Sequence, residues 1–163
     1  AREFAVRPLR LLFVCTGNTC RSPMAELLAQ LRLEVMGLDG IEVSSAGTSA
    51  VDGAPASVPA RAVARVRGVS LESHRSRRLT TERIGDVDLV VAMTDRHARE
   101  VSRLDPQAVV VLATSVLPDS HPARGLDLPD PFGGSLNDYE ETWTAIDACV
   151  QALLDRIATE RGD

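Results

Sequence analysis

Residues 9–23 read Leu-Arg-Leu-Leu-Phe-Val-Cys-Thr-Gly-Asn-Thr-Cys-Arg-Ser-Pro, and this stretch decides the fold. Leu9 to Val14 is a short apolar run interrupted only by Arg10 and bounded by a proline and a glycine, which is typical of a buried β-strand. From Pro23 onward, apolar residues recur at helical spacing, and proline is tolerated in the first turn of a helix. The stretch therefore predicts a strand, a tight turn and a helix in direct succession.

The rest of the chain continues this alternation of strands and helices. The expected elements are a strand at Ile41–Ala46, a helix from about Pro59 with Val63 and Val66 on one face and Gly68 as its stop, a strand at Val87–Ala92, a helix at Asp95–Arg103, a strand at Val109–Leu112, a long loop at Ala113–Gly134 and a helix from Ser135 to about Arg161. Such alternation indicates an α/β protein, a three-layer sandwich around a four-stranded parallel sheet. Ligands of such folds bind at the carboxyl ends of the strands, which directs attention to Cys15.

The composition narrows the class of protein. A chain of 163 residues with 44% hydrophobic residues has the size of one domain, expected at 9–161 after an N-terminal extension at 1–8. Its net charge of -5 argues against nucleic acid and anionic membranes as partners, because both attract basic surfaces. Three cysteines are too few for a disulfide-stapled secreted scaffold, and no apolar run resembles a membrane span or a signal peptide. We therefore expect a cytoplasmic protein.

The loop between the first strand and the first helix is expected to bind an anion. Backbone N–H groups and a helix N-terminus converge there, Gly17 permits conformations closed to other residues, and Asn18 tolerates left-handed ones. Arg21 adds a planar fork of donors suited to two phosphate oxygens. We expect these positive surroundings to favour the thiolate form of Cys15, a nucleophile to which the Ser22 hydroxyl donates a hydrogen bond.

Two other interpretations of this loop are disfavoured by the residues that the chain contains. A zinc clip on Cys15 and Cys20 needs two further ligands, and the remaining candidates are not spaced as a pair: His74, His97, His121 and Cys149. A nucleotide-binding loop that ends in Gly-Lys-Ser/Thr needs a lysine, and all 18 basic residues are arginine. We expect neither a metal nor a cofactor.

A thiolate that attacks phosphorus also needs a proton donor for the leaving group, usually from another segment. The long loop offers three aspartates, Asp119, Asp127 and Asp130. We favour Asp130, because residues 130–134 combine a fixed turn, an aromatic side chain and glycines that permit close approach. Asp-Pro is also a common turn in its own right, so the choice depends on the pairing with the Cys15 loop.

Taken together, these residues resemble the low-molecular-weight protein tyrosine phosphatase family over nearly the whole chain. The matching segments are the phosphate loop at 15–22, Ser45-Ala46-Gly47, His74-Arg75-Ser76-Arg77, Asp88-Leu89-Val90-Val91-Ala92-Met93 and Asp130-Pro131-Phe132. The resemblance implies a cysteinyl-phosphate intermediate, with Asp130 acting first as acid and then as base for the hydrolytic water.

The resemblance also assigns supporting roles around the nucleophile. It implies that Asn18, Ser45 and His74 form a hydrogen-bond network that holds the phosphate loop open. It further implies that Cys20 forms a reversible disulfide with Cys15 that protects the thiolate. The residues expected to bind phosphate or to support the loop are Thr16, Gly17, Asn18, Thr19, Cys20, Ser22, Ser45 and His74.

Two departures from the family pattern concern the substrate. Thr19 stands where tyrosine-directed members usually have isoleucine, and the loop resembles that of bacterial protein-arginine phosphatases, in which a threonine hydroxyl helps to place water and the guanidinium. Phe132, the expected substrate wall, stands where many tyrosine-directed members have tyrosine or tryptophan. Val51 stands where some of them have tryptophan. With fewer aromatic side chains around the site, a bound phenyl ring loses stacking energy, typically about 0.5–1.5 kcal/mol per pair of rings. Both departures favour phosphoarginine and leave phosphotyrosine open.

The sequence thus predicts a metal-independent phosphatase that acts on phosphorylated proteins and holds phosphate or another oxyanion in its loop. A strict phosphotyrosine phosphatase is the nearest alternative. An arsenate reductase on the same fold would need an extra pair of cysteines in mid-chain, and residues 21–148 contain none. A non-catalytic phosphate-binding module would be expected to lack the nucleophile or the acid, and Cys15 and Asp130 are both present.

Overall fold

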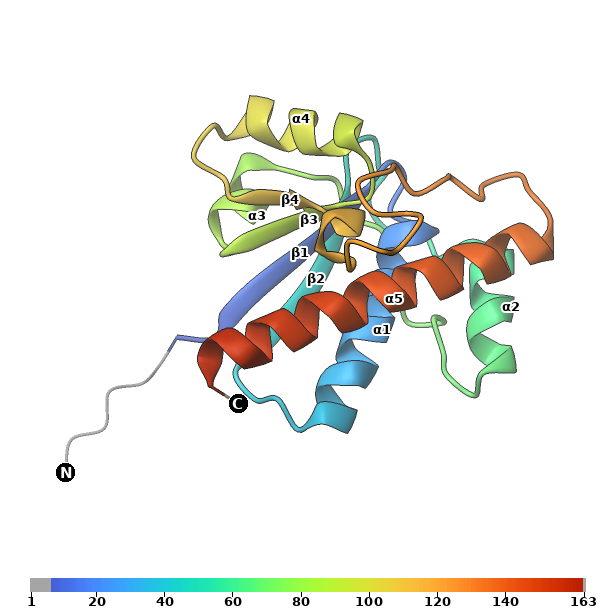
Figure 1. Ribbon diagram of the computed structural model, residues 1–163. Coiled ribbons are helices and arrows are strands. Elements are labelled where there is room, and N and C mark those ends of the chain that lie inside the picture. The colour runs from blue at the N-terminus through green and yellow to red at the C-terminus, as the bar shows by residue number, and fades with distance from the viewer. Residues whose placement is uncertain (1–6, 163) are drawn as a thin grey trace.

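The middle layer of the molecule is a parallel sheet of four strands in the order β2-β1-β3-β4 (Figure 1). The strands are β1 (Leu9–Cys15), β2 (Ile41–Gly47), β3 (Leu89–Ala92) and β4 (Val110–Leu112). The structure is a computed structural model that describes residues 7–162, so most of the extension expected at 1–8 lies outside the described residues. The three-layer α/β fold and its four-stranded parallel sheet are confirmed.

Helices cover both faces of the sheet (Figure 1). On one side lie α1 (Arg21–Met36), α2 (Val58–Val66) and α5 (Leu136–Arg161), and on the other α3 (Thr81–Gly85) and α4 (Asp95–Leu104), while a 3-10 turn, η1 (Ala113–Val116), follows β4. No helix in the described range 7–162 is long and apolar enough to cross a membrane.

Alternating side chains of β1 supply the two cores. Leu11 and Phe13 pack into the larger cluster with α1 and α5, whereas Leu12 and Val14 pack into the smaller cluster with α3, β3 and α4. Because both faces of the strand are covered, its apolar run is continuous, as expected for a central parallel strand. This burial fixes the position at which Cys15 leaves the sheet.

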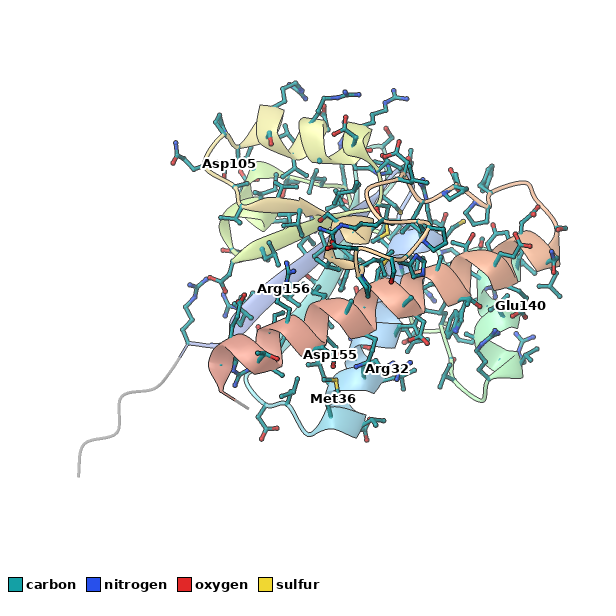
Figure 2. All side chains as sticks on the ribbon, viewed as in Figure 1. Arg32, Met36, Asp105, Glu140, Asp155 and Arg156 are labelled. Carbon is teal, nitrogen blue, oxygen red and sulfur yellow. The ribbon has the colours of Figure 1, made fainter. Side chains whose placement is uncertain are left out.

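An ion pair joins the last helix, α5, to α1. Arg32 donates both of its hydrogen bonds to Asp147 at 3.0 and 2.7 Å, and Figure 2 shows Arg32 and Met36 beside α5. At its start α5 has a reciprocal cap, in which Ser135 and Asp138 each accept from the other's backbone N–H. The helix thus begins at a defined residue directly after the loop that carries Asp130.

Several details differ from the sequence prediction. Helix α1 begins at Arg21, ahead of Pro23, so two residues of the predicted turn are helical. Val66, predicted on the same face of its helix as Val63, is 75% exposed, because α2 packs through Ala60, Val63 and Ala64 and Val66 lies beyond that contact. The short helix α3 was not predicted, since its five residues are too few for a periodic pattern.

The last residue of β2, Gly47, lies against the loop that follows Cys15. Its N–H donates to the carbonyl of Arg77 at 2.9 Å, and a Cβ at this position would lie 2.8 Å from the backbone N of Asn18 and in collision with the carbonyl oxygen of Thr16. The third close atom is Cβ of Ala50 at 2.9 Å, so no flexible side chain can give way there.

We predict that Gly47→Ala lowers the free energy of unfolding by about 2–3 kcal/mol, because the added methyl group forces the two backbones apart. Gly85→Ala is the matched control, since a Cβ on Gly85 meets nothing within 4 Å, and its stability should be unchanged or slightly raised. Urea unfolding midpoints measure both variants. Equal midpoints for the two would contradict the close approach.

Candidate active site

The predicted phosphate loop leaves the sheet at the carboxyl end of β1 and turns directly into α1. Cys15 is the last residue of the strand and is 2% exposed. The backbone N–H of Thr48 donates to the carbonyl of Cys15, and that of Ser49 donates to the carbonyl of Thr16, both at 2.9 Å. A hollow of about 210 Å³ opens above the loop and is lined by Cys15, Thr16, Gly17, Thr19, Cys20, Arg21, Asp130 and Phe132.

Asn18 is fully buried and organises this loop. Its side-chain Nδ2 donates to Ser22 Oγ at 2.8 Å and to Ser45 Oγ at 2.9 Å, while its Oδ1 accepts from the N–H of Arg77 at 2.9 Å. Its carbonyl oxygen lies 2.7 Å from Nε2 of His74, and because a carbonyl cannot donate, that nitrogen carries the proton. Asn18, Ser45 and His74 are therefore in contact, and His74 supports the loop from outside the hollow.

The left-handed backbone conformation in this loop belongs to Asn18 and not to Gly17. In the described chain Asn18 is the only residue other than glycine with a positive φ, at 55°, whereas Gly17 does not have a positive φ. A Cβ on Gly17 would also make only an ordinary 3.5 Å contact with Thr19. The expectation that Asn18 adopts a left-handed conformation is confirmed, and its own side chain holds it there, whereas Gly17 does not use the freedom that its missing side chain permits.

The nucleophile candidate receives a directed hydrogen bond. Cys15 Sγ lies 2.8 Å from Ser22 Oγ. Since Ser22 Oγ already accepts a hydrogen bond from Asn18 Nδ2, its own hydroxyl proton is free to point at the sulfur. A chain of donors thus runs from Asn18 through Ser22 to Cys15, and it stabilises negative charge on the sulfur.

Arg21 places a charge in the hollow with only 3% of its surface exposed. One terminal nitrogen donates to the carbonyl of Leu128 at 2.9 Å, and the other lies 3.4 Å from Thr16 Oγ1 and 3.4 Å from Asp130 Oδ2. Among residues 7–162 its Nε has no hydrogen-bond partner. A buried, unpaired guanidinium N–H is costly unless it faces an acceptor, and an oxyanion in the hollow supplies one.

The structure separates the three candidate aspartates. Asp130 lines the hollow with its side chain about half exposed, and its Oδ1 accepts from the N–H of Phe132 at 3.1 Å. Asp127 instead accepts from the N–H of Asp95 at 2.7 Å, at the start of α4. Asp119 is 97% exposed and pairs with Arg124 at 3.5 Å. Only Asp130 of the three lines the hollow with Cys15.

Phe132 stands at the mouth of the hollow and is 73% exposed. Its ring is thus available to contact a bound group, as the predicted substrate wall would be. Thr19 also lines the hollow, and its hydroxyl lies 3.8 Å from the sulfur of Cys20.

His97 is a functional candidate that the sequence did not reveal. It is 4% exposed, with Nε2 2.8 Å from Thr16 Oγ1 and Nδ1 2.9 Å from Thr94 Oγ1. Burial, helped by the charge of Arg21, lowers the pKa of His97 to about 4, so the ring is neutral at pH 7. Thr94 marks the start of α4 in the sequence, but no pattern shows that His97 contacts the loop after β1.

Two hydroxyl groups lie beside Cys20, and the sequence alone indicates neither contact. Its sulfur lies 3.2 Å from the hydroxyl of Tyr139 and 3.5 Å from that of Ser57, and all three cysteines are free thiols. Burial raises the pKa of Tyr139 to about 12, so its hydroxyl keeps its proton. In the sequence Tyr139 falls among the regularly spaced apolar residues of the last helix, and that pattern does not indicate its contact with Cys20. Cys149, on that same helix, lies in the core, where burial raises its pKa to about 11.

Comparison with known proteins identifies relatives along almost the entire chain. The sequence model of the family described as low molecular weight phosphotyrosine protein phosphatase matches residues 10–162. The chain is 38% identical to a protein-arginine-phosphatase of Geobacillus stearothermophilus, over 94% of this chain and 99% of that one. It is 37% identical to low molecular weight protein-tyrosine phosphatase A of Mycobacterium tuberculosis, over 91% of each.

Solved structures show the same likeness. A YwlE arginine phosphatase, in a variant whose active-site cysteine is replaced by a phosphorylated serine, superimposes with a TM-score of 0.85 at 33% identity, over 94% of this chain and 98% of that one. The tyrosine phosphatase Wzb from Escherichia coli K30, in complex with sulphate, superimposes with a TM-score of 0.80 at 27% identity, over 91% and 97% of the two chains.

The buried, neutral His97 makes the stability of the fold depend on pH. In the unfolded chain its pKa returns to about 6.5, so the unfolded state binds more protons between about pH 6.5 and about pH 4. Stability is therefore lost as the pH falls through this window. From this residue we predict a loss of about 2–3 kcal/mol across it.

The prediction is checked by chemical unfolding of the protein and of His97→Gln at several pH values. The variant lacks this titration, so its stability should fall less steeply between the two pKa values. His121→Gln serves as the control, because His121 is only partly buried and lies outside the hollow. Parallel pH profiles for His97→Gln and the unchanged chain would show that His97 is not held neutral.

Proposed function

The chain belongs to the low molecular weight phosphotyrosine protein phosphatase family and is a cysteine-based protein phosphatase, and we propose that it hydrolyses phosphoarginine in proteins through a phosphoryl intermediate on Cys15. The observation that carries the mechanism is the placement of Cys15, Arg21 and Asp130 around one hollow. The relative with a phosphorylated serine in place of its active-site cysteine supports a covalent intermediate at this position.

In the first step the thiolate of Cys15 attacks phosphorus. The S–P bond forms while the bond from phosphorus to the arginine nitrogen breaks, and Asp130, as a carboxylic acid, gives its proton to the departing nitrogen. Arg21 and the backbone N–H groups of the loop hold the phosphoryl oxygens. The arginine side chain leaves, and the phosphoryl group remains on sulfur.

In the second step water replaces the sulfur. Asp130, now a carboxylate, accepts a proton from the attacking water as the new O–P bond forms and the S–P bond breaks. Inorganic phosphate and the Cys15 thiolate are the products. The Ser22 hydroxyl, 2.8 Å from the sulfur, stabilises the departing thiolate and makes it a better leaving group.

The preference for phosphoarginine rests on Thr19 and on the mouth of the hollow. Thr19 brings a hydroxyl to the hollow, and a guanidinium carries several N–H donors that a hydroxyl oxygen accepts, whereas a phenyl ring carries none. Among the described residues that line the hollow, Phe132 is the only aromatic one, so a phenyl ring would find little flat surface to stack on. Phosphotyrosine remains the second candidate, because a tyrosine phosphatase is almost as similar in sequence as an arginine phosphatase.

The proposed setting is the cytoplasm, with a phosphorylated protein as partner and residues 9–161 as one catalytic domain. All three cysteines are buried free thiols, and unpaired thiols are the usual state of cysteines in a reducing compartment. Members of the family bind phosphorylated substrates and oxyanions, as the sulphate complex illustrates.

The roles of the two central residues are tested by Cys15→Ser and Asp130→Asn. We expect Cys15→Ser to abolish turnover of an arginine-phosphorylated protein, and Asp130→Asn to lower kcat by about 10²–10⁴-fold, the usual contribution of a general acid. Asp127→Asn and Asp119→Asn are the controls. The assignment fails if activity survives in Cys15→Ser but is lost with a chelator, or if a control aspartate matters more than Asp130.

The substrate preference is tested by Thr19→Ile. The ratio of kcat/KM for a phosphoarginine protein to that for a phosphotyrosine peptide should fall at least severalfold, because the apolar side chain removes the acceptor for guanidinium protons. Thr81→Ile, at an exposed position on α3, controls for the substitution itself. An unchanged ratio in Thr19→Ile would refute the part assigned to this hydroxyl.

A further inference from the structure

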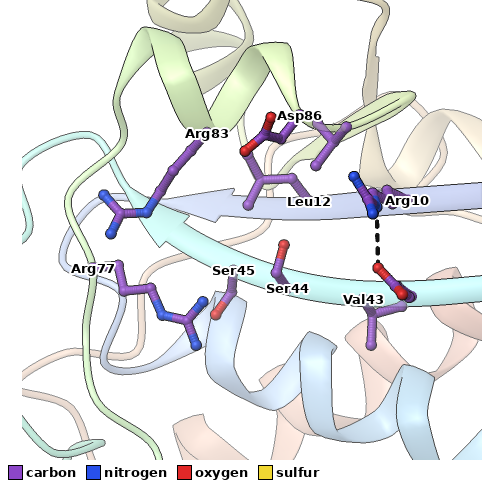
Figure 3. A pocket seen from close by; sticks show the side chains of 10 residues that line it. Arg10, Leu12, Val43, Ser44, Ser45, Arg77, Arg83 and Asp86 are labelled. Carbon is purple, nitrogen blue, oxygen red and sulfur yellow. Dashed lines mark hydrogen bonds and ion pairs between the residues drawn. The ribbon is translucent and has the colours of Figure 1, made fainter.

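A second hollow, of about 330 Å³, lies at the edge strand β2 and contains neither Cys15 nor Asp130 (Figure 3). Its walls come from β1, from β2 and from residues 77–87. Figure 3 shows the side chains of Arg77 and Arg83 at one end and the hydrogen-bonded pair of Arg10 and Glu42 at the other.

The charges at the two ends of this hollow differ. Arg10 is neutralised by Glu42 at 3.1 Å. Arg83 donates to the carbonyl of Arg78 at 2.8 Å, but no carboxylate in the described chain forms an ion pair with Arg83 or with Arg77. Two guanidinium groups without an acidic partner favour a phosphate-type anion, whose oxygens accept bidentate hydrogen bonds.

The remaining walls indicate what else a ligand would carry. Leu12, Val43 and Val87 also line the hollow and add apolar groups, and Asp86 adds a carboxylate, which attracts a hydrogen-bond donor. The hollow therefore fits a small phosphorylated molecule that also carries a hydroxyl or amino group.

This hollow is connected to the catalytic loop through Asn18. Ser45, which lines the hollow, accepts from Asn18 Nδ2 at 2.9 Å, and the backbone N–H of Arg77 donates to Asn18 Oδ1 at 2.9 Å. The same Asn18 Nδ2 holds Ser22 beside Cys15. Residues that line the second hollow thus supply two of the hydrogen bonds that fix the loop.

We propose that the hollow at β2 binds a small phosphate-bearing anion between Arg77 and Arg83, and that this binding alters the turnover of the enzyme through Asn18. The binding is inferred from the hollow and the residues that line it, whereas the effect on turnover rests on the proposed function. A phosphomonoester and free phosphate share the recognised group, and the two are distinguished by experiment.

Binding is measured by titrating the full chain with inorganic phosphate and, separately, with O-phosphoserine, while the backbone amide resonances are followed by NMR. Amides of residues 15–22 report the catalytic loop, and those of Ser44, Arg83 and Val87 report the second hollow. We expect two groups of shifts with different dissociation constants. The double variant Arg77→Gln/Arg83→Gln should weaken the second binding at least tenfold and leave the first unchanged, whereas Arg75→Gln, outside this hollow, should change neither.

These titrations distinguish a phosphomonoester from free phosphate and also test whether the second hollow is a binding site. A response to O-phosphoserine that is stronger than the response to phosphate assigns the site to a phosphomonoester, and an equal response assigns it to the phosphate group alone. Shifts confined to residues 15–22, or second-hollow shifts that survive the double variant, overturn the site.

The effect on turnover is measured with p-nitrophenyl phosphate at saturating concentration. A ligand that competes in the catalytic loop raises KM only, so a change in kcat that disappears in the double variant is the expected result. An unchanged kcat overturns the coupling to Asn18. If Cys15→Ser retained turnover, the proposed function would fail while the NMR result on binding would stand.

Discussion

The whole site depends on the side chain of Asn18. A non-glycine residue with a positive φ is strained by the contact of its Cβ with its own backbone, and only local hydrogen bonds make that conformation persist. Here one buried residue bonds to three different segments. Its side-chain amide reaches the start of α1 through Ser22, the end of β2 through Ser45 and the backbone N–H of Arg77, and its backbone carbonyl accepts from His74 in the same segment 74–77. The conformation of the loop and the position of the Cys15 sulfur follow from these bonds.

The second constraint is the burial of charge. Arg21 is almost fully enclosed, and its surroundings contain a neutral histidine, a backbone carbonyl and one half-exposed carboxylate. A second positive charge at His97 would be unfavourable next to this guanidinium, which is why burial and Arg21 both lower the pKa of the histidine. The hollow is therefore positive enough to hold a phosphoryl group, although the chain as a whole carries a net charge of -5.

Local patterns in the sequence predict the part of this arrangement that local chemistry controls. The continuous apolar run before Cys15, the proline at the start of α1 and the alternation of strands and helices lead to the parallel sheet and to a loop at its carboxyl edge. Contacts between distant segments have no such signal. His97 and Tyr139 follow ordinary helical patterns, and only the packing of α4 and α5 against the loop brings them to Thr16 and Cys20. Gly17 and Asn18 are both expected to permit unusual backbone conformations, and only Asn18 adopts a positive φ. The sequence identifies which residues tolerate such a conformation and not which one uses it.

The most direct test of the account is a rapid-quench measurement of the first turnover on a protein labelled at the phosphoryl group of phosphoarginine. The account predicts that the label appears on the peptide containing Cys15 before it appears as free phosphate, because hydrolysis of the cysteinyl phosphate is a separate step. Free phosphate released from the first time point onward, with no label on that peptide at any time, would contradict it.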